Sequence, residues 1–122
     1  MMKKILVIDD EIDICEILKT FLKGEGYEII IANNYNDAME KLKQKPDLVL
    51  LDIAMPYKNG IETLKDIKNK NKSIPVIMIT AYRDAEKVVQ AFRLGAFDCI
   101  FKPFDFNYLR TCILASIGIP SH

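Results

Sequence analysis

Five polar residues in this chain of 122 residues come at the ends of short apolar runs. They are Asp9, Asp10, Asp52, Thr80 and Lys102. Unbroken apolar runs are typical of strands that are buried on both faces, as in parallel sheets. Because parallel strands end at the same edge of a sheet, we expect these side chains to form one compact polar site. Carboxylates, a hydroxyl and an ammonium together can bind a divalent cation and a phosphoryl group.

The apolar pattern predicts five strands that alternate with helices. We expect the strands at residues 3–8, 27–32, 47–52, 76–79 and 99–101. Helical spacing of apolar residues predicts helices over 12–22, 36–45 and 60–69. Two more helices are expected after the potential N-caps Asp84 and Asp105. Residues 1–122 would then form one domain.

Strands that alternate with helices need crossover connections, which implies a parallel sheet with helices on both faces. The expected fold is therefore α/β, a three-layer sandwich around a five-stranded parallel sheet with five helices. In the flavodoxin-like strand order 2-1-3-4-5, ligands bind beyond the carboxyl ends of the first and third strands. Asp9, Asp10 and Asp52 would meet at that point.

The order and separation of these five residues resemble the receiver domain of two-component response regulators, the CheY-like superfamily. The segments at 52–60 and 94–104 also resemble the family's pattern, so the resemblance covers essentially the whole chain. It implies that Asp52 is the phosphoacceptor, that Thr80 is the switch hydroxyl and that Lys102 contacts the phosphoryl group. It also implies a cis peptide bond before Pro103.

Three neighbouring carboxylates would raise one another's pKa unless a cation were present. Mg²⁺ suits the set because it prefers oxygen ligands and takes one or two carboxylates together with phosphate oxygens. We expect Asp10 and Asp52 to be direct ligands and Asp9 to act mainly through water. The matching family position adds the backbone carbonyl of Ala54, and Mn²⁺ is an expected substitute.

A carboxylate is nucleophilic as it stands, so Asp52 needs no histidine base. The one histidine, His122, lies at the chain end. Ala81 would leave room for the incoming group. The family tunes the lifetime of the acyl phosphate two positions beyond the acceptor and two beyond the threonine, at Ala54 and Tyr82 here. These residues predict slow autodephosphorylation.

The sequence departs from the family three positions before the lysine, where the usual aromatic switch residue is replaced by Cys99. Activation would then be transmitted through Thr80 and the fourth helix, or Phe101 would act in place of the missing ring. Some phosphorelay regulators also lack this aromatic, which favours a role in a phosphorelay.

The family resemblance implies that the first helix and the loop after the fifth strand bind a sensor histidine kinase or a phosphotransfer protein. The candidate contact residues are Ile14, Leu18 and Phe104. Ile14 is the best of these for an exposed docking residue, since part of the apolar set, including Leu18, is also needed for the core.

Composition excludes several other classes. The formal net charge is zero and basic residues are dispersed, except between 65 and 72, so direct binding of nucleic acid by this chain is not expected. No apolar stretch reaches the length of a membrane span, and we expect a cytoplasmic protein. Its three cysteines, Cys15, Cys99 and Cys112, are expected to be core residues. A monomer or a weak, phosphorylation-dependent dimer is expected.

The leading hypothesis is a phosphorylation-controlled switch that does not turn over substrate as an enzyme does. One alternative is a pseudo-receiver, which binds partners without phosphorylation. Another is the receiver part of a longer transcriptional regulator. A flavin-binding protein of the same topology is disfavoured, because the acids after the first strand would repel a phosphate.

Overall fold

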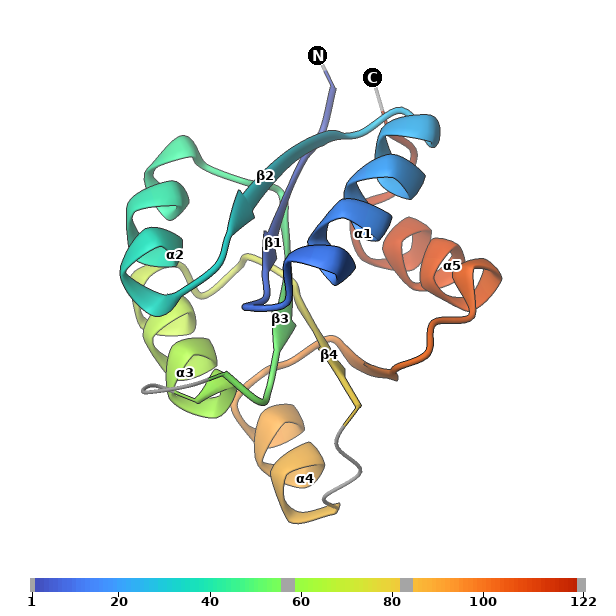
Figure 1. Ribbon diagram of the computed structural model, residues 1–122. Helices are drawn as coiled ribbons and strands as arrows, with labels where there is room; N and C mark the ends of the chain where they lie inside the picture. Colours follow the sequence, from blue (N-terminus) through green and yellow to red (C-terminus); the bar gives the residue numbers. More distant parts are fainter. Residues whose placement is uncertain (1, 56–58, 82–84, 121–122) are drawn as a thin grey trace.

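A computed structural model describes residues 2–55, 59–81 and 85–120, and its centre is a parallel sheet (Figure 1). The strands are β1 (Lys4–Ile8), β2 (Glu28–Ala32), β3 (Leu48–Asp52), β4 (Val76–Thr80) and β5 (Asp98–Phe101). Their order is β2-β1-β3-β4-β5, with every neighbouring pair parallel. The predicted strand order is therefore confirmed.

Helices cover both faces of this sheet. They are α1 (Ile12–Gly24), α2 (Tyr35–Lys41), α3 (Gly60–Lys70), α4 (Ala85–Arg93) and α5 (Phe106–Ile117). Figure 1 shows α1 and α5 on one side of the sheet and α2, α3 and α4 on the other. This arrangement confirms the three-layer α/β sandwich.

The predicted second helix is shorter than expected. The α-helix ends at Lys41, and a 3₁₀ turn, η1 (Leu42–Gln44), follows it. Lys45 then adopts a left-handed conformation with φ 55°. A proline cannot continue a helix, and it disfavours the helical conformation for the residue before it, so Pro46 accounts for the early end.

Each face of the sheet has its own apolar core. Every residue of β3 and β4 is buried, because helices pack on both sides of these central strands. Alternate strand residues point to opposite faces, so Leu48 and Leu50 pack with α1 and α5, whereas Val49 and Leu51 pack with α3. Packing on both faces therefore fixes the sheet, including the edge at which its parallel strands end.

Side-chain caps start three of the helices. Asn34 accepts a hydrogen bond from the backbone of Asp37, Asn59 from that of Glu62, and Asp105 from those of Asn107 and Tyr108. The cap predicted at Asp105 is thus confirmed. The one predicted at Asp84 lies outside the described residues.

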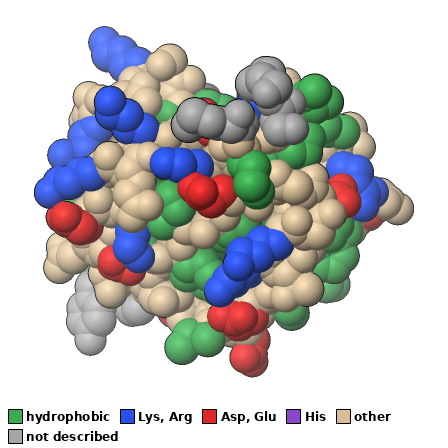
Figure 2. Space-filling model, turned by 90° about the horizontal axis from the view of Figure 1, so that it is seen from above, with side chains coloured by type: hydrophobic (Ala, Val, Ile, Leu, Met, Phe, Trp, Pro, Cys, Tyr) green, Lys and Arg blue, Asp and Glu red, His purple; other side chains and the backbone are tan. Residues whose placement is uncertain are grey.

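The cysteines behave as core residues: Cys15, Cys99 and Cys112 are buried and form no disulfide. Among the described residues, no helix is long and apolar enough to cross a membrane. Figure 2 looks onto the end of the molecule where both termini lie. Several lysine or arginine side chains gather on one side of this face, and acidic side chains lie among the basic ones on the rest of it.

Candidate functional site

The three predicted acids meet at the carboxyl edge of the sheet. Asp9 and Asp10 follow β1, and Asp52 is the last residue of the neighbouring strand β3. One carboxylate oxygen from each residue lies within 4.8 Å of the others. Asp9 and Asp52 are buried, whereas Asp10 is exposed. The acidic cluster expected from the sequence is therefore present, and it could bind a metal.

Lys102 reaches this cluster from the end of β5. Its Nζ lies 2.9 Å from Oδ2 of Asp9 and 3.7 Å from Oδ2 of Asp52. The side chain is only 9% exposed. The following peptide bond to Pro103 is cis, as the resemblance implied. Lys102 is thus a largely buried cation among carboxylates.

Burial and the neighbouring charge of Asp9 raise the pKa of Asp52 to about 7. The ammonium of Lys102 and a hydrogen bond from the backbone N–H of Ala54, 3.2 Å from Oδ1, lower it again but do not cancel the rise. Burial would lower the pKa of Lys102, but hydrogen bonds to Glu11 and Asp9 raise it above its ordinary value. The ammonium therefore stays charged, and it compensates Asp52 only in part.

This donor set fits a hard divalent cation. Three carboxylates converge, one of them exposed, and the compensation of Asp52 by Lys102 is incomplete. A cation bound by Asp10 and Asp52 would neutralise the remaining repulsion and leave positions open for other oxygen ligands. Ala54, two residues beyond Asp52, is exposed, and the role of its backbone carbonyl as a metal ligand stays a prediction.

Thr80 lies at the carboxyl end of β4, between the strands that carry Asp52 and Lys102. It is fully buried, and its backbone carbonyl accepts a hydrogen bond from the Lys102 N–H at 2.8 Å. Ala81 is exposed directly after it. Tyr82, the predicted tuning residue, lies outside the described residues. The sheet thus brings Asp52, Thr80 and Lys102 to the ends of three neighbouring strands.

Gly60 allows the chain to return close to Asp52 at the start of α3. Its N–H donates to the carbonyl of Ile53 at 2.8 Å. A Cβ at this position would lie 2.2 Å from the carbonyl oxygen of Asp52 and 2.5 Å from Cα of Ile53. Both are backbone atoms that cannot move aside, so only glycine fits here.

The residue at the aromatic position of the family, Cys99, is buried against the core beneath α3 and α4. Burial, with a smaller contribution from Asp98, raises the pKa of its thiol to about 11. Phe101 lies two residues further along β5, half-buried against the same core. The replacement of the missing ring by Phe101 stays a prediction.

Of the predicted partner-binding residues on α1, Leu18 cannot be an exposed contact residue, and Ile14 is only partly accessible. Leu18 is fully buried in the core beneath α1 and α5, and Ile14 is half-buried against it. The exposed apolar residues of α1 are instead Ile12 and Ile17, at 66% and 48% exposure. Apart from Ile12, the apolar residues of α1 form one broad stripe centred near Leu18, and Ile17 lies at the edge of this stripe, where spacing alone does not decide whether a side chain is covered.

The third predicted partner residue, Phe104, is also half-buried. Its ring centroid lies 6.0 Å from that of Phe106, which in turn lies 4.6 Å from that of Phe21. These rings connect the loop after β5 to α1 and α5. Phe106, Ile17 and Phe21 line a shallow hollow between the two helices, together with Glu16 and Thr20.

Glu11 was not predicted as part of the site. Its carboxylate lies 2.9 Å from Nζ of Lys102, the same distance as that of Asp9. In the sequence, Glu11 directly follows the acid pair. An acid at this position is explained equally well by its favourable interaction with the N-terminus of the following helix, so its position alone did not indicate a role in the site. Only the fold brings it to a lysine that is 91 positions away.

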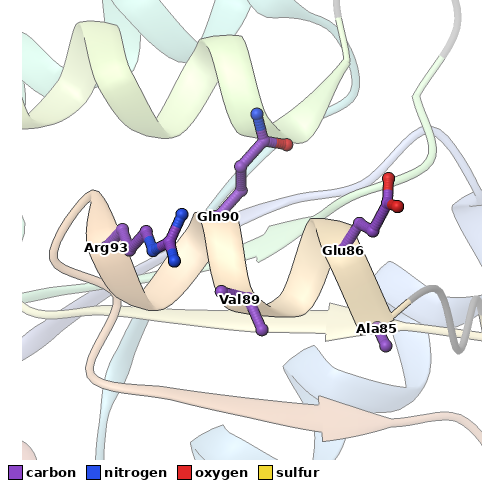
Figure 3. Close-up of a pocket in the computed structure, with 5 residues that line it drawn as sticks. All are labelled: Ala85, Glu86, Val89, Gln90 and Arg93. Carbon is purple, nitrogen blue, oxygen red and sulfur yellow. The ribbon is translucent and has the colours of Figure 1, made fainter.

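Another hollow lies over α4, away from the acidic cluster. Figure 3 shows the residues that line it, all from this one helix: Ala85, Glu86, Val89, Gln90 and Arg93. None of the residues of the acidic cluster contributes to it. It is therefore not the candidate site.

Comparison with known proteins identifies the family of this arrangement. The family described as "Response regulator receiver domain" matches residues 5–114. The transcriptional regulatory protein ZraR of Klebsiella oxytoca is 50% identical over 115 residues, which cover 93% of this chain and 26% of that protein. The CpxR homolog of Haemophilus influenzae is 46% identical over 114 residues, 93% of this chain and 50% of that protein. The chain thus spans between a quarter and a half of these relatives.

Solved structures agree with these relatives. A CheY-like receiver domain protein from Methanospirillum hungatei matches with a TM-score of 0.91 and 30% identity, over 96% of this chain and 94% of that one. NtrX from Brucella abortus matches with a TM-score of 0.89 and 34% identity, over 96% of this chain and 27% of that one.

Proposed function

Because this chain belongs to the response regulator receiver domain family, we propose that it takes up a phosphoryl group on Asp52 and thereby switches its contacts with partners. The observation that carries this assignment is the difference between the two buried acids. Both oxygens of Asp9 are engaged, by the Glu11 N–H and by Lys102. Oδ2 of Asp52 lies 3.7 Å from the ammonium, beyond hydrogen-bond distance. Of the two buried acids, Asp52 is therefore the one whose oxygens are not held by the ammonium, which supports it as the nucleophile.

In the proposed reaction, a carboxylate oxygen of Asp52 attacks the phosphorus atom of a phosphohistidine. The new P–O bond forms as the P–N bond breaks, and the electron pair of that bond leaves with the donor's nitrogen. Lys102 turns its ammonium to an oxygen of the transferred group, and the Thr80 hydroxyl donates a hydrogen bond to another. No histidine base is required, because a carboxylate is nucleophilic once it is ionised, and a cation held by Asp10 and Asp52 would favour the ionised form.

Asp10 and Asp52, the Ala54 carbonyl and, through water, Asp9 would hold Mg²⁺ or Mn²⁺. Such an ion neutralises charge on the phosphoryl oxygens. The exposed carboxylate of Asp10 and the raised pKa of Asp52 support this choice of ligands. The protein would act as a phosphorylated switch rather than as an enzyme with turnover.

The proposed phosphodonor is a sensor histidine kinase or a phosphotransfer protein. Several relatives are transcriptional regulators, and this chain matches only part of each. This supports a receiver that controls transcription as part of a longer protein and is located in the cytoplasm. We also propose that the receiver unit extends beyond the matched residues 5–114 to the whole of 1–122, since α5 continues to Ile117.

Incubation with acetyl phosphate and Mg²⁺, followed by intact mass measurement, tests the proposal. We expect one added phosphoryl group in the wild type, none in Asp52→Asn, and normal labelling in Asp13→Asn, which removes an exposed acid of α1. A wild-type protein that stays unlabelled would instead support a pseudo-receiver. A phosphopeptide that maps to Asp9 or Asp10 would contradict the choice of Asp52.

A further inference from the structure

Lys102 shares its ammonium between two carboxylates that differ in exposure. Nζ lies 2.9 Å from Oδ2 of Asp9 and 2.9 Å from Oε1 of Glu11. The side chain of Asp9 is fully buried, whereas that of Glu11 is 58% exposed. The two acids therefore hold the same cation, one from inside the site and the other from its rim.

We propose that Glu11 is a positioning residue, which holds the Lys102 ammonium away from Asp52 and releases it when Lys102 contacts a phosphoryl group on Asp52. This inference rests on the proposed function and adds a regulatory contact to the same site. Glu11 would then oppose the phosphorylated state, because its ion pair with Lys102 exists only in the resting protein.

The hydrogen bonds around Lys102 support Glu11, and not Asp9, as the carboxylate that releases the ammonium. Asp9 accepts a second bond, from the backbone N–H of Glu11 to Oδ1 at 2.9 Å, and its side chain is fully buried. If Asp9 lost the ammonium, a buried carboxylate would lose its ion pair, which is costly. Glu11 can exchange the ammonium for water.

No capping hydrogen bond competes with Lys102 for the side chain of Glu11. Glu11 occupies the N-cap position of α1, but its side chain makes no capping hydrogen bond. Its backbone N–H, not its carboxylate, fixes Asp9. The substitution Glu11→Gln keeps that N–H and the side-chain shape while it removes the charge, so it isolates the contact to Lys102.

Binding of beryllium fluoride, a non-covalent mimic of the phosphoryl group, tests the inference at saturating Mg²⁺. Backbone amide NMR shifts can follow the titration, since the chain contains no tryptophan. We expect Glu11→Gln to lower the apparent Kd about two- to five-fold, the range that a partly exposed ion pair supplies. Glu11→Asp, which keeps the charge on a shorter side chain, should fall between Glu11→Gln and the wild type.

A double-mutant cycle with Lys102→Ala separates a contact with the lysine from a general effect of charge. Without Lys102, the substitution Glu11→Gln should no longer change the Kd. Asp13→Asn removes the same charge from the same first turn and should leave the Kd within about a factor of two of the wild type. Thermal unfolding of every variant checks that each is folded.

An unchanged or higher Kd in Glu11→Gln would overturn the inference. So would an equal gain in the absence of Lys102 or in Asp13→Asn, because either would show that the charge acts without the lysine. If the wild type neither binds beryllium fluoride nor accepts a phosphoryl group, the proposed function fails as well. A failure limited to the Glu11 comparison overturns only the positioning role.

Discussion

Nζ of Lys102 lies 3.7 Å from Oδ2 of Asp52, close enough for charge attraction but too far for a hydrogen bond. Asp52 is 2% exposed, so its carboxylate has lost most of its water. A buried charge that is only partly compensated costs folding free energy. This relationship leads to the first prediction, which concerns stability in the absence of metal.

In EDTA, the free energy of unfolding should fall as the pH rises from about 4 to 7. Burial and Asp9 raise the pKa of Asp52 from 3.8 to about 7, so in this range the folded protein binds more protons than the unfolded chain. The slope for one proton is at most about 1.4 kcal/mol per pH unit.

Urea unfolding followed by circular dichroism at several pH values measures this slope. Asp52→Asn should flatten it and be more stable than the wild type at pH 8, whereas the exposed control Asp13→Asn should keep it. A wild-type curve that rises with pH across this range would contradict the prediction.

Mg²⁺ should stabilise the wild-type protein, because a ligand that binds only the folded state raises its stability. Asp10→Ala should remove this gain together with labelling by acetyl phosphate, since Asp10 is the exposed acid of the cluster. The melting temperature, measured with Mg²⁺ and with EDTA, gives the gain for each variant. If Asp10→Ala kept the wild-type shift, the metal would be bound elsewhere.

Gly60→Ala should destabilise the fold by about 1–3 kcal/mol or more, as expected where an added atom meets a packed backbone. The new Cβ would lie 2.2 Å from the carbonyl oxygen of Asp52. Gly24→Ala is the matched control, since a Cβ there meets nothing within 4 Å. Urea denaturation of both variants provides the measurement, and equal stability of the two would refute the steric explanation.

Ile17→Ala should slow phosphoryl transfer from the cognate kinase and leave labelling by acetyl phosphate nearly unchanged. Ile17 is 48% exposed on α1, and truncation of an apolar contact residue can cost about 2 kcal/mol of binding. A small donor needs no docking surface. The control Val89→Ala removes an equally exposed side chain from α4, on the other side of the sheet, and should transfer normally.

Equal loss of labelling with both donors would mean that Ile17 supports the fold or the site. Normal transfer from the kinase would exclude the exposed side of α1 as the docking surface.

The sequence by itself determined the strands and the acids at their ends, and the family resemblance supplied the order of the strands. Each central strand is a continuous apolar run, because helices cover both of its faces, and a run of this kind is recognisable without knowledge of its neighbours. Parallel strands share one carboxyl edge, so the meeting of Asp9, Asp10 and Asp52 follows from the topology.

Only the tertiary structure decided which residues of α1 are exposed and which acid holds the lysine. The apolar spacing of α1 already directed Leu18 toward the core, but only the packing of the helix against the sheet leaves Ile17 exposed and Ile14 half-buried. Glu11 and Lys102 are 91 positions apart and belong to no common local pattern, so their contact arises from the position of β5 in the sheet and the N-terminus of α1. Periodicity reports local spacing, whereas these contacts depend on distances between elements, which the folded chain alone sets.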